Sequence, residues 1–225
     1  SGFAGSFGSE TQFVGPNSST AAQIKYFMPK RHTFGKMTLE IHDMDGNIVA
    51  TPGAGKSKGI NIVNWSFRGK PPKVAKGKTI ISSGLIGPEV KAGTYKAVLK
   101  KGKDSFEKEF KVIYDERTGL SDKDRTLKYD TTMKLFDMTE ELAYLVYEVD
   151  TYIEATKESN KKVSAKLTDL KETLVVTTGD NYTDSAELQL REKLSDLFNK
   201  ISSAYDKPSA AEMANLSSIE SRFEK

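Results

Sequence analysis

The spacing of apolar residues changes once along this chain, near residue 116, and this change limits what the chain can fold into. Before that point, apolar and polar residues alternate in short runs, as in half-buried strands. After it, apolar residues recur every three or four positions, as on one face of an amphipathic helix. The sequence therefore predicts an α+β fold in which the strands come first and the helices follow.

The segment from Gly87 to Asp115 carries the clearest strand pattern. Two alternating runs flank Lys101–Asp104, where the Gly and Asp residues favour a hairpin tip. The alternating apolar residues are Tyr95, Ala97 and Leu99 in the first run and Phe110, Val112 and Tyr114 in the second. We interpret this segment as the last hairpin of an immunoglobulin-like β-sandwich.

Shorter strands are predicted before this hairpin, separated by Gly-, Pro- and Asp-rich turns. Asp45-Gly46 predicts a two-residue hairpin turn, because Gly tolerates positive φ. Residues 68–78 are rich in Lys, Gly and Pro and predict a loop. The predicted strands cover residues 24–28, 37–41, 48–49, 59–67 and 79–81.

Amphipathic helices are predicted after residue 116, the first and longest from about 121 to about 158. Its start, Ser121-x-x-Asp124, resembles a capping box. Each helix has one polar face, so the apolar stripes are expected to pack together. The other three helices are predicted over Val163–Leu174, from Asp184-x-x-Glu187 onwards, and from the capping box Ser209-x-x-Glu212.

These patterns predict three regions within the 225 residues. Residues 1–22 are a Gly/Ser-rich arm or linker. Residues 23–115 are an immunoglobulin-like or fibronectin-like antiparallel β-sandwich, and residues 116–225 are an α-helical bundle with one long helix. Because the chain starts at Ser1 without a signal-peptide pattern, we expect it to be a fragment of a larger protein.

The composition excludes several kinds of site. There are no cysteines, which excludes disulfides, thiolate metal sites and a Cys nucleophile. No stretch approaches the ~20 apolar residues of a membrane-spanning helix. We predict no cofactor, no metal and no catalytic residue in this chain.

The charge is divided unevenly between the two predicted regions. Residues 1–115 hold 18 Lys and Arg against 9 Asp and Glu, whereas residues 116–225 hold 16 against 22. The Lys residues are scattered and lack the aromatic interleaving of single-strand-binding surfaces, so we do not expect nucleic acid as a partner. We expect instead that the basic and acidic regions contact each other and that salt weakens this contact modestly.

Three short patterns resemble known sites. Ala50–Ser57 resembles a phosphate-binding loop, but the following residues predict a strand, not the helix that such a loop needs. Asp43-x-Asp45-Gly46-Asn47 resembles the start of a calcium loop but lacks the later Glu, so a hairpin turn is favoured. His32 and His42, the two histidines, lie in no ligand-spaced pair.

Two further groups have both a structural and a functional interpretation. Trp65 with Tyr26 and Phe67 forms either part of the sandwich core, which we favour, or a sugar-stacking platform. Acidic residues of the long helix form either a solvated face, which we favour, or a pair of catalytic acids. These acidic residues are Glu140, Glu141, Glu148 and Asp150.

Several of these segments together resemble a C-terminal region found in large bacterial proteins with sortilin-like β-propellers built of BNR/Asp-box repeats. The resemblance covers residues 15–120. It is carried by residues 26–29, by 39–43 with Gly46, by 59–68 and by 87–95. In that family, common in Bacteroidota and often labelled glycosyl hydrolases, this region is similar to the immunoglobulin-like domain of flagellar hook-capping proteins.

The resemblance implies a non-catalytic accessory module of an exported protein, periplasmic, outer-membrane-associated or extracellular. Its partner would be the β-propeller of the parent protein or another protein. The alternative is a module that binds a glycan or a protein, and an enzyme is the third possibility. Any glycosidase site implied by the family would lie in the propeller, so no catalytic residue carries over to this chain.

Overall fold

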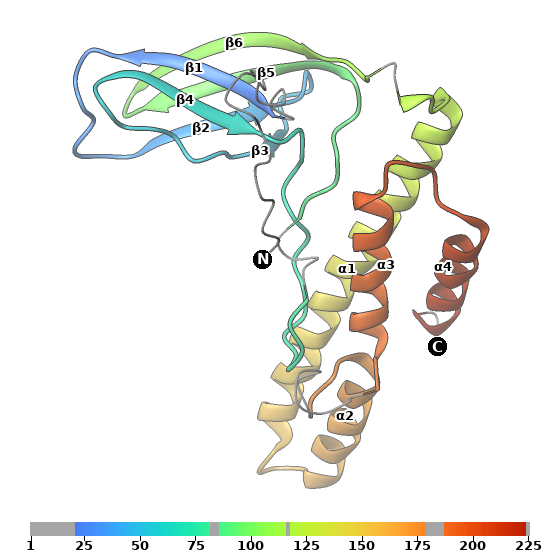
Figure 1. The fold of residues 1–225 in the computed structure, drawn as a ribbon. Helices are drawn as coiled ribbons and strands as arrows, with labels where there is room; N and C mark the ends of the chain where they lie inside the picture. The colour runs from blue at the N-terminus through green and yellow to red at the C-terminus, as the bar shows by residue number, and fades with distance from the viewer. Residues whose placement is uncertain (1–20, 82–85, 116–117, 179–186, 224–225) are drawn as a thin grey trace, which may run out of the picture.

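The computed structural model describes residues 21–81, 86–115, 118–178 and 187–223. In these residues six strands precede four helices, which confirms the predicted α+β fold. Figure 1 shows the strands gathered at one end of an elongated assembly of helices. We call residues 21–115 the β half and residues 118–223 the helical half. The predicted arm lies outside the described residues, except that the first strand already begins at Ala22.

The strands form two antiparallel sheets with a common hydrophobic core. One sheet has the order β1-β4 and the other the order β3-β2-β5-β6. The strands are β1 (Ala22–Met28), β2 (Met37–His42), β3 (Ile48–Ala50), β4 (Gly59–Trp65), β5 (Gly93–Lys101) and β6 (Asp104–Val112). The β5–β6 hairpin turns through Gly102 and Lys103, as predicted, and Tyr95 opposes Phe110 in its register.

Alternating side chains fill the space between the two sheets. Trp65 lies at the centre and is 4% exposed. Its ring contacts those of Phe67, Tyr95 and Phe110 at centroid distances of 5.4, 6.0 and 5.9 Å. Its indole N–H donates to the carbonyl of Arg68 at 2.9 Å, so the polar edge of the ring is satisfied. Trp65 is therefore part of the core between the sheets, which is the interpretation that we favoured over a sugar-stacking platform.

Two local predictions in the β half are wrong. Residues 79–81 are not a strand, because Thr79 binds the helical half and Ile80 points into solvent with 98% of its surface exposed. The β2–β3 turn has Met44 and Asp45 at its centre in place of Asp45-Gly46. Gly46 follows the turn and donates to the Asp43 carbonyl at 3.2 Å.

The helices are α1 (Asp122–Thr156), α2 (Lys161–Leu174), α3 (Leu190–Ser203) and α4 (Ala210–Phe223). The hydroxyl of Ser121 accepts from the backbone N–H of Asp124 at 3.2 Å, which caps α1 as predicted. Ser209 and Glu212 form the second predicted capping box. The third helix begins at Leu190, later than expected: Glu187 precedes it without being helical, and Asp184 lies outside the described residues.

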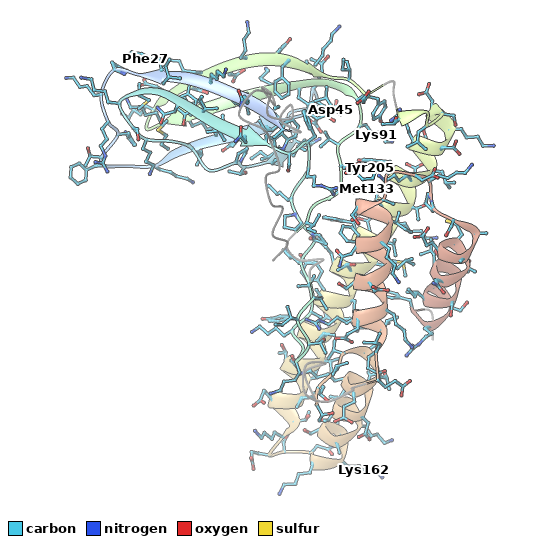
Figure 2. All side chains as sticks on the ribbon, viewed as in Figure 1. Phe27, Asp45, Lys91, Met133, Lys162 and Tyr205 are labelled. Atoms are coloured by element: carbon cyan, nitrogen blue, oxygen red, sulfur yellow. The ribbon has the colours of Figure 1, made fainter. Side chains whose placement is uncertain are left out.

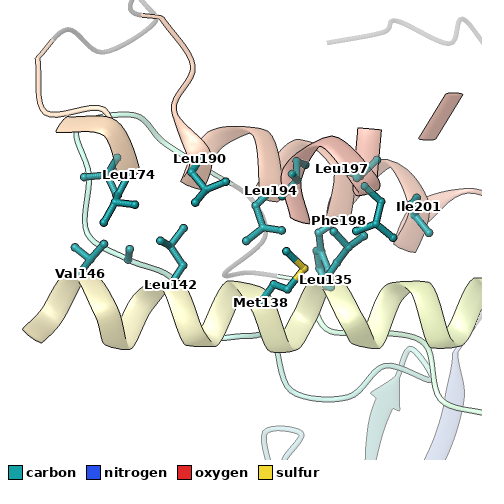
Figure 3. Close-up of a cluster of buried hydrophobic side chains, with 14 residues drawn as sticks. Leu135, Met138, Leu142, Val146, Leu174, Leu190, Leu194, Leu197, Phe198 and Ile201 are labelled. Carbon is teal, nitrogen blue, oxygen red and sulfur yellow. The ribbon is translucent and has the colours of Figure 1, made fainter. Parts of the chain in front are cut away.

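The core of the helical half lies between α1 and α3 and extends to α2 and α4 (Figure 3). Leu135, Leu142, Leu194 and Phe198 are at most 2% exposed there. Almost the whole circumference of α3 is covered; its exposed positions are Asp196, Lys200 and Ser203. Each Leu of this kind contributes roughly 2 kcal/mol through burial.

The segment between β4 and β5, residues 66–92, joins the two halves, and we call it the connector. Figure 1 shows it leaving the sheets, running along α1 and returning to β5. Near the sheets its two limbs are close together, since Gly69 donates to the carbonyl of Pro88 at 2.8 Å. Gly87 is required here, because a Cβ would lie 1.9 Å from the carbonyl oxygen of Gly69. The predicted loop, residues 68–78, is thus part of a long excursion along α1 (Figure 1), of which residues 82–85 lie outside the described residues.

Candidate functional site

A buried polar network, the Arg191 anchor, fixes the far end of the connector to α3. Arg191 donates from Nε to the carbonyl of Ala75 at 2.7 Å and from Nη1 to the hydroxyl of Thr79 at 2.9 Å. Glu192 accepts from Arg191 Nη1 and from the Thr79 hydroxyl, both at 2.7 Å. Gly77 leaves room for the guanidinium, because a Cβ there would lie 2.8 Å from Nη1. The anchor consists of these five residues.

The anchor depends on the connector for its balance of charges and hydrogen bonds. Arg191, Glu192 and Thr79 are 7%, 4% and 3% exposed. Burial of an ion pair costs several kcal/mol per ion unless hydrogen bonds complete it. The connector supplies the carbonyl and hydroxyl groups that do so, while Glu192 Oε2 has no partner within the described residues. α3 therefore needs the connector in place to keep these charges buried.

A second set of polar contacts joins the halves close to the sheets. Arg68 donates to Glu89 at 3.0 Å and to the carbonyl of Ser202 at 3.2 Å. Lys128 of α1 donates to the same Glu89 at 3.3 Å and to the carbonyl of Ala204 at 2.5 Å. Two cations thus share one carboxylate, and both bind the end of α3.

The predicted contact between a basic β half and an acidic helical half is seen only in part. Lys91 of the β half lies 3.6 Å from Asp130 of α1 and 4.1 Å from the Tyr129 ring centroid. The Glu89–Lys128 pair has the opposite polarity. The basic and acidic regions do contact each other, but through these few groups and the connector.

A cavity of about 450 Å³ opens between the two halves beside these contacts. We call it the junction cleft. Its walls come from the connector, the end of β6 and the residues after it, the first turns of α1 and the segment after α3. Figure 2 labels Tyr205 of this segment where the strands meet the helices. The residues that define the cleft are Phe67, Val90, Tyr114, Arg125, Lys128 and Tyr205.

One wall of the cleft is built on a strained residue. Phe67 has φ of 58°, the left-handed region that bulky side chains rarely adopt. Its carbonyl accepts from the backbone of Val90 at 2.9 Å, and its ring packs on Trp65. Strain of this kind costs about 1–3 kcal/mol and collects at functional sites. The strained backbone places the ring of Phe67 at the cleft.

Arg125 presents an oriented guanidinium to the cleft. Its Cζ lies 4.3 Å from the centroid of the Tyr114 ring. Its Nη2 donates to the Thr118 hydroxyl at 2.7 Å and to the carbonyl of Asp115 at 3.4 Å. Within the described residues, Arg125 forms no ion pair with a carboxylate. A positioned cation of this kind is suited to binding an anion.

The loop that resembles a phosphate-binding loop runs directly into β4, as predicted, and not into a helix. The carbonyl of Gly55 accepts from the Tyr26 hydroxyl at 2.6 Å. Asn61 binds both the N–H and the carbonyl of Ser57. These contacts close the loop on itself, without the helix N-terminus that would hold phosphates.

The calcium-like motif is a closed turn. Asp43 accepts from the backbone N–H of Asp45 and of Asn47 at 3.0 and 2.8 Å, and from the Asn47 side chain at 2.9 Å. The Asn47 amide, above all, holds the pKa of the Asp43 carboxyl below its usual range. Its oxygens are occupied by the turn's own donors. In the described ranges no cluster of three or more metal-ligating side chains is found.

The two histidines have separate surroundings. His32 contacts the carbonyl of Gly35 at 3.2 Å. His42 contacts Glu40 at 2.8 Å, and Glu40 also lies 3.4 Å from the Thr38 hydroxyl. In a catalytic triad the imidazole lies between hydroxyl and carboxylate, whereas here the carboxylate lies in the middle. The group on β2 is therefore not arranged as a triad.

The acidic residues of α1 are not brought together as paired acids. Glu140 accepts from the backbone N–H of Lys73 at 3.0 Å, and Asp150 accepts from Lys171 at 2.5 Å. Glu141 and Glu148 are exposed. Two of the four thus hold the connector and α2 against α1.

Sequence reasoning missed the anchor and the cleft. Arg191 and Glu192 belong to the predicted third helix, for which only one polar face was expected in general. One signal was present: small residues, Ser195 and Ser202, leave room for a neighbour on the second face of α3. No local spacing reveals that this neighbour is the connector, more than 100 residues earlier.

No helix in the described ranges has the length and apolarity needed to span a membrane. A scan against protein-family models found no match, and searches of curated proteins and of solved structures found no significant match. The resemblance to the C-terminal region of sortilin-like propeller proteins therefore stays a prediction.

Proposed function

We propose that this chain is a non-catalytic accessory module of a larger exported protein with a sortilin-like β-propeller. Its role is to hold the propeller in place, by packing within the parent protein or by assembly with another protein. In this proposal the β half is an immunoglobulin-like or fibronectin-like sandwich and the helical half is a bundle with one long helix.

The observation that carries the proposal is the double attachment of the two halves. The Arg191 anchor fixes the connector to α3 far from the sheets; close to the sheets, Arg68 binds the other end of α3 and Glu89 accepts from Lys128 of α1. Relative motion of two domains is the usual expectation, and attachment at two separate points limits it. A restrained spacer suits a structural role, whereas the polar residues singled out as candidate chemistry are engaged in local structure.

Binding of this chain to the propeller tests the proposal. The gene upstream of Ser1 is sequenced, and the propeller it encodes is produced separately and titrated with the chain by calorimetry. We expect saturable binding. A gene without a propeller, or a propeller that does not bind the chain, contradicts the proposal.

The alternative is a module that binds a protein or a glycan, and the junction cleft is the observation that favours it. Its volume of about 450 Å³ is in the range of small-molecule sites. Calorimetric titration of the chain with a set of soluble polysaccharides separates the glycan version from the structural role.

A further inference from the structure

We propose that the junction cleft binds a segment of a protein partner that presents a carboxylate beside an apolar side chain. This inference rests on the proposed role in protein assembly and identifies where the partner is held. The residues that carry it come from both halves, so the cleft exists only when the halves are joined.

The cationic part of the cleft is incompletely neutralised. Two cations, Arg125 and Lys128, and two carboxylates, Glu89 and Asp115, line the cleft. Glu89 is shared between Arg68 and Lys128. Lys128 has only 13% of its side chain exposed, so its position is fixed by these contacts. Arg125 forms no ion pair with either carboxylate among the described residues, so its charge is left for an anionic group in the cleft.

Arg125 is the group that receives this anion. Its two hydrogen bonds, to Thr118 and to the Asp115 carbonyl, both come from Nη2. The N–H groups on Nε and Nη1 have no partner recorded among the described residues. Because the guanidinium is already stacked on Tyr114, it loses little freedom when it binds a carboxylate.

The apolar part of the cleft lies beside this cation. Phe67, Val90 and Val112 are among the apolar residues that line it. Tyr205 at the rim is 92% exposed, an unusual position for an aromatic side chain with no packing of its own. Aromatic side chains at the mouth of a pocket contribute contact area at low entropic cost. A ligand with both an anionic and an apolar group matches both parts.

The test uses the whole chain and a matched pair of small probes. 4-Phenylbutyrate carries a carboxylate and an aromatic ring, whereas 4-phenylbutanamide has the same shape without the charge. Amide chemical shifts of the ¹⁵N-labelled chain are followed in each titration. We expect the carboxylate probe to shift Tyr114, Arg125 and Tyr205 with a Kd on the order of 1 mM, and the amide to bind about tenfold more weakly or not at all.

Two variants identify the residues. Arg125→Met is expected to weaken the carboxylate probe about tenfold, and Tyr205→Ala about threefold. Tyr205 is exposed, so its replacement leaves the fold intact even if Arg125→Met perturbs α1. Arg31→Met, at an exposed residue of the β1–β2 connection, is the matched control and should change nothing.

Every other outcome overturns the inference. Equal binding of the two probes would mean that the cleft is only apolar. Glucuronate, titrated in parallel, carries a carboxylate without an apolar group; if it binds more tightly than 4-phenylbutyrate, the ligand is an acidic glycan and not a protein segment. No shift with any probe would remove the site. None of these results bears on propeller binding, so the proposed function fails or stands separately.

Discussion

The hydrophobic cores of the two halves differ in where their residues come from. The buried core of the β half consists of residues from its own strands, with no contribution from a described helix. The core of the helical half includes Ala75 of the connector beside residues of the four helices. The connector also donates from Lys78 to the carbonyl of Val176 at 3.0 Å. The sheets are self-sufficient, whereas the helices are completed by a segment of the β half.

The largest expected effect comes from separating the halves. A fragment of residues 21–115 should unfold cooperatively, because its core is intact. A fragment of residues 118–223 should keep helical signal but lose cooperative unfolding, because Ala75 and Thr79 are missing. Fluorescence of Trp65 reports on the first fragment, and circular dichroism with urea reports on the second. If both fragments unfold cooperatively, the helical half does not depend on the connector, and the two halves do not differ in this respect.

The next effect concerns the Arg191 anchor. Arg191→Met should lower the free energy of unfolding by about 3–5 kcal/mol, because it leaves Glu192 buried without its partner. The double variant Arg191→Met/Glu192→Leu should recover most of this loss, since no charge is then left buried. Urea unfolding measures both.

Arg222→Met, at an exposed position in the last turn of α4, is the control and should change stability by less than about 0.5 kcal/mol. If the double variant is as unstable as the single one, the loss comes from packing and not from charge.

The ionic group on β2 should have a smaller effect that depends on pH. Glu40 accepts from Lys100 and His42, both at 2.8 Å, and the Lys100 hydrogen bond, more than His42, lowers the pKa of the Glu40 carboxyl. A lowered pKa in the folded state means that the stabilisation is complete above about pH 4.3 and is lost as the pH falls through the folded value.

Glu40→Gln should therefore cost about 1 kcal/mol at pH 7 and less at pH 3. Urea unfolding of the wild type and the variant at both pH values measures the difference. A cost that is equal at both pH values would show that the carboxylate charge is not involved.

The smallest effect is expected where the connector crosses α1 at the surface. Lys73 donates to the Tyr144 hydroxyl at 2.5 Å and lies 4.9 Å from the ring centroid. Lys73→Met should lower the temperature of unfolding only slightly, and high salt should remove most of the difference. Thermal unfolding at low and high salt measures it. A larger, salt-resistant loss would mean that the connector is held at this point as firmly as at the anchor.

Local patterns predicted the regular elements well but could not predict what the connector does. The alternation around Tyr95 and the capping box at Ser121 depend on neighbours close in sequence, and both are observed. Thr79 and Ile80 were interpreted as part of a strand, and β-branched residues favour strands. In the structure, contacts with α3 set the position of Thr79, and Ile80 is left in solvent. Arg191 likewise follows a helical pattern whose polar face is covered by a distant segment. The cleft needs both halves in place, so no single stretch of sequence indicates it.

Because α1 is long, a small rotation at the junction produces a large displacement at the far end of the helix. Its 35 residues extend roughly 52 Å at 1.5 Å per residue, and the sheets lie near its first turns (Figure 1). A tilt of about 10° at that end would displace the opposite tip by roughly 9 Å. The connector opposes such a tilt, because it is bound to the helices partway along their length. A partner that opens or closes the cleft would therefore displace the far end of α1 more than any other part of that helix.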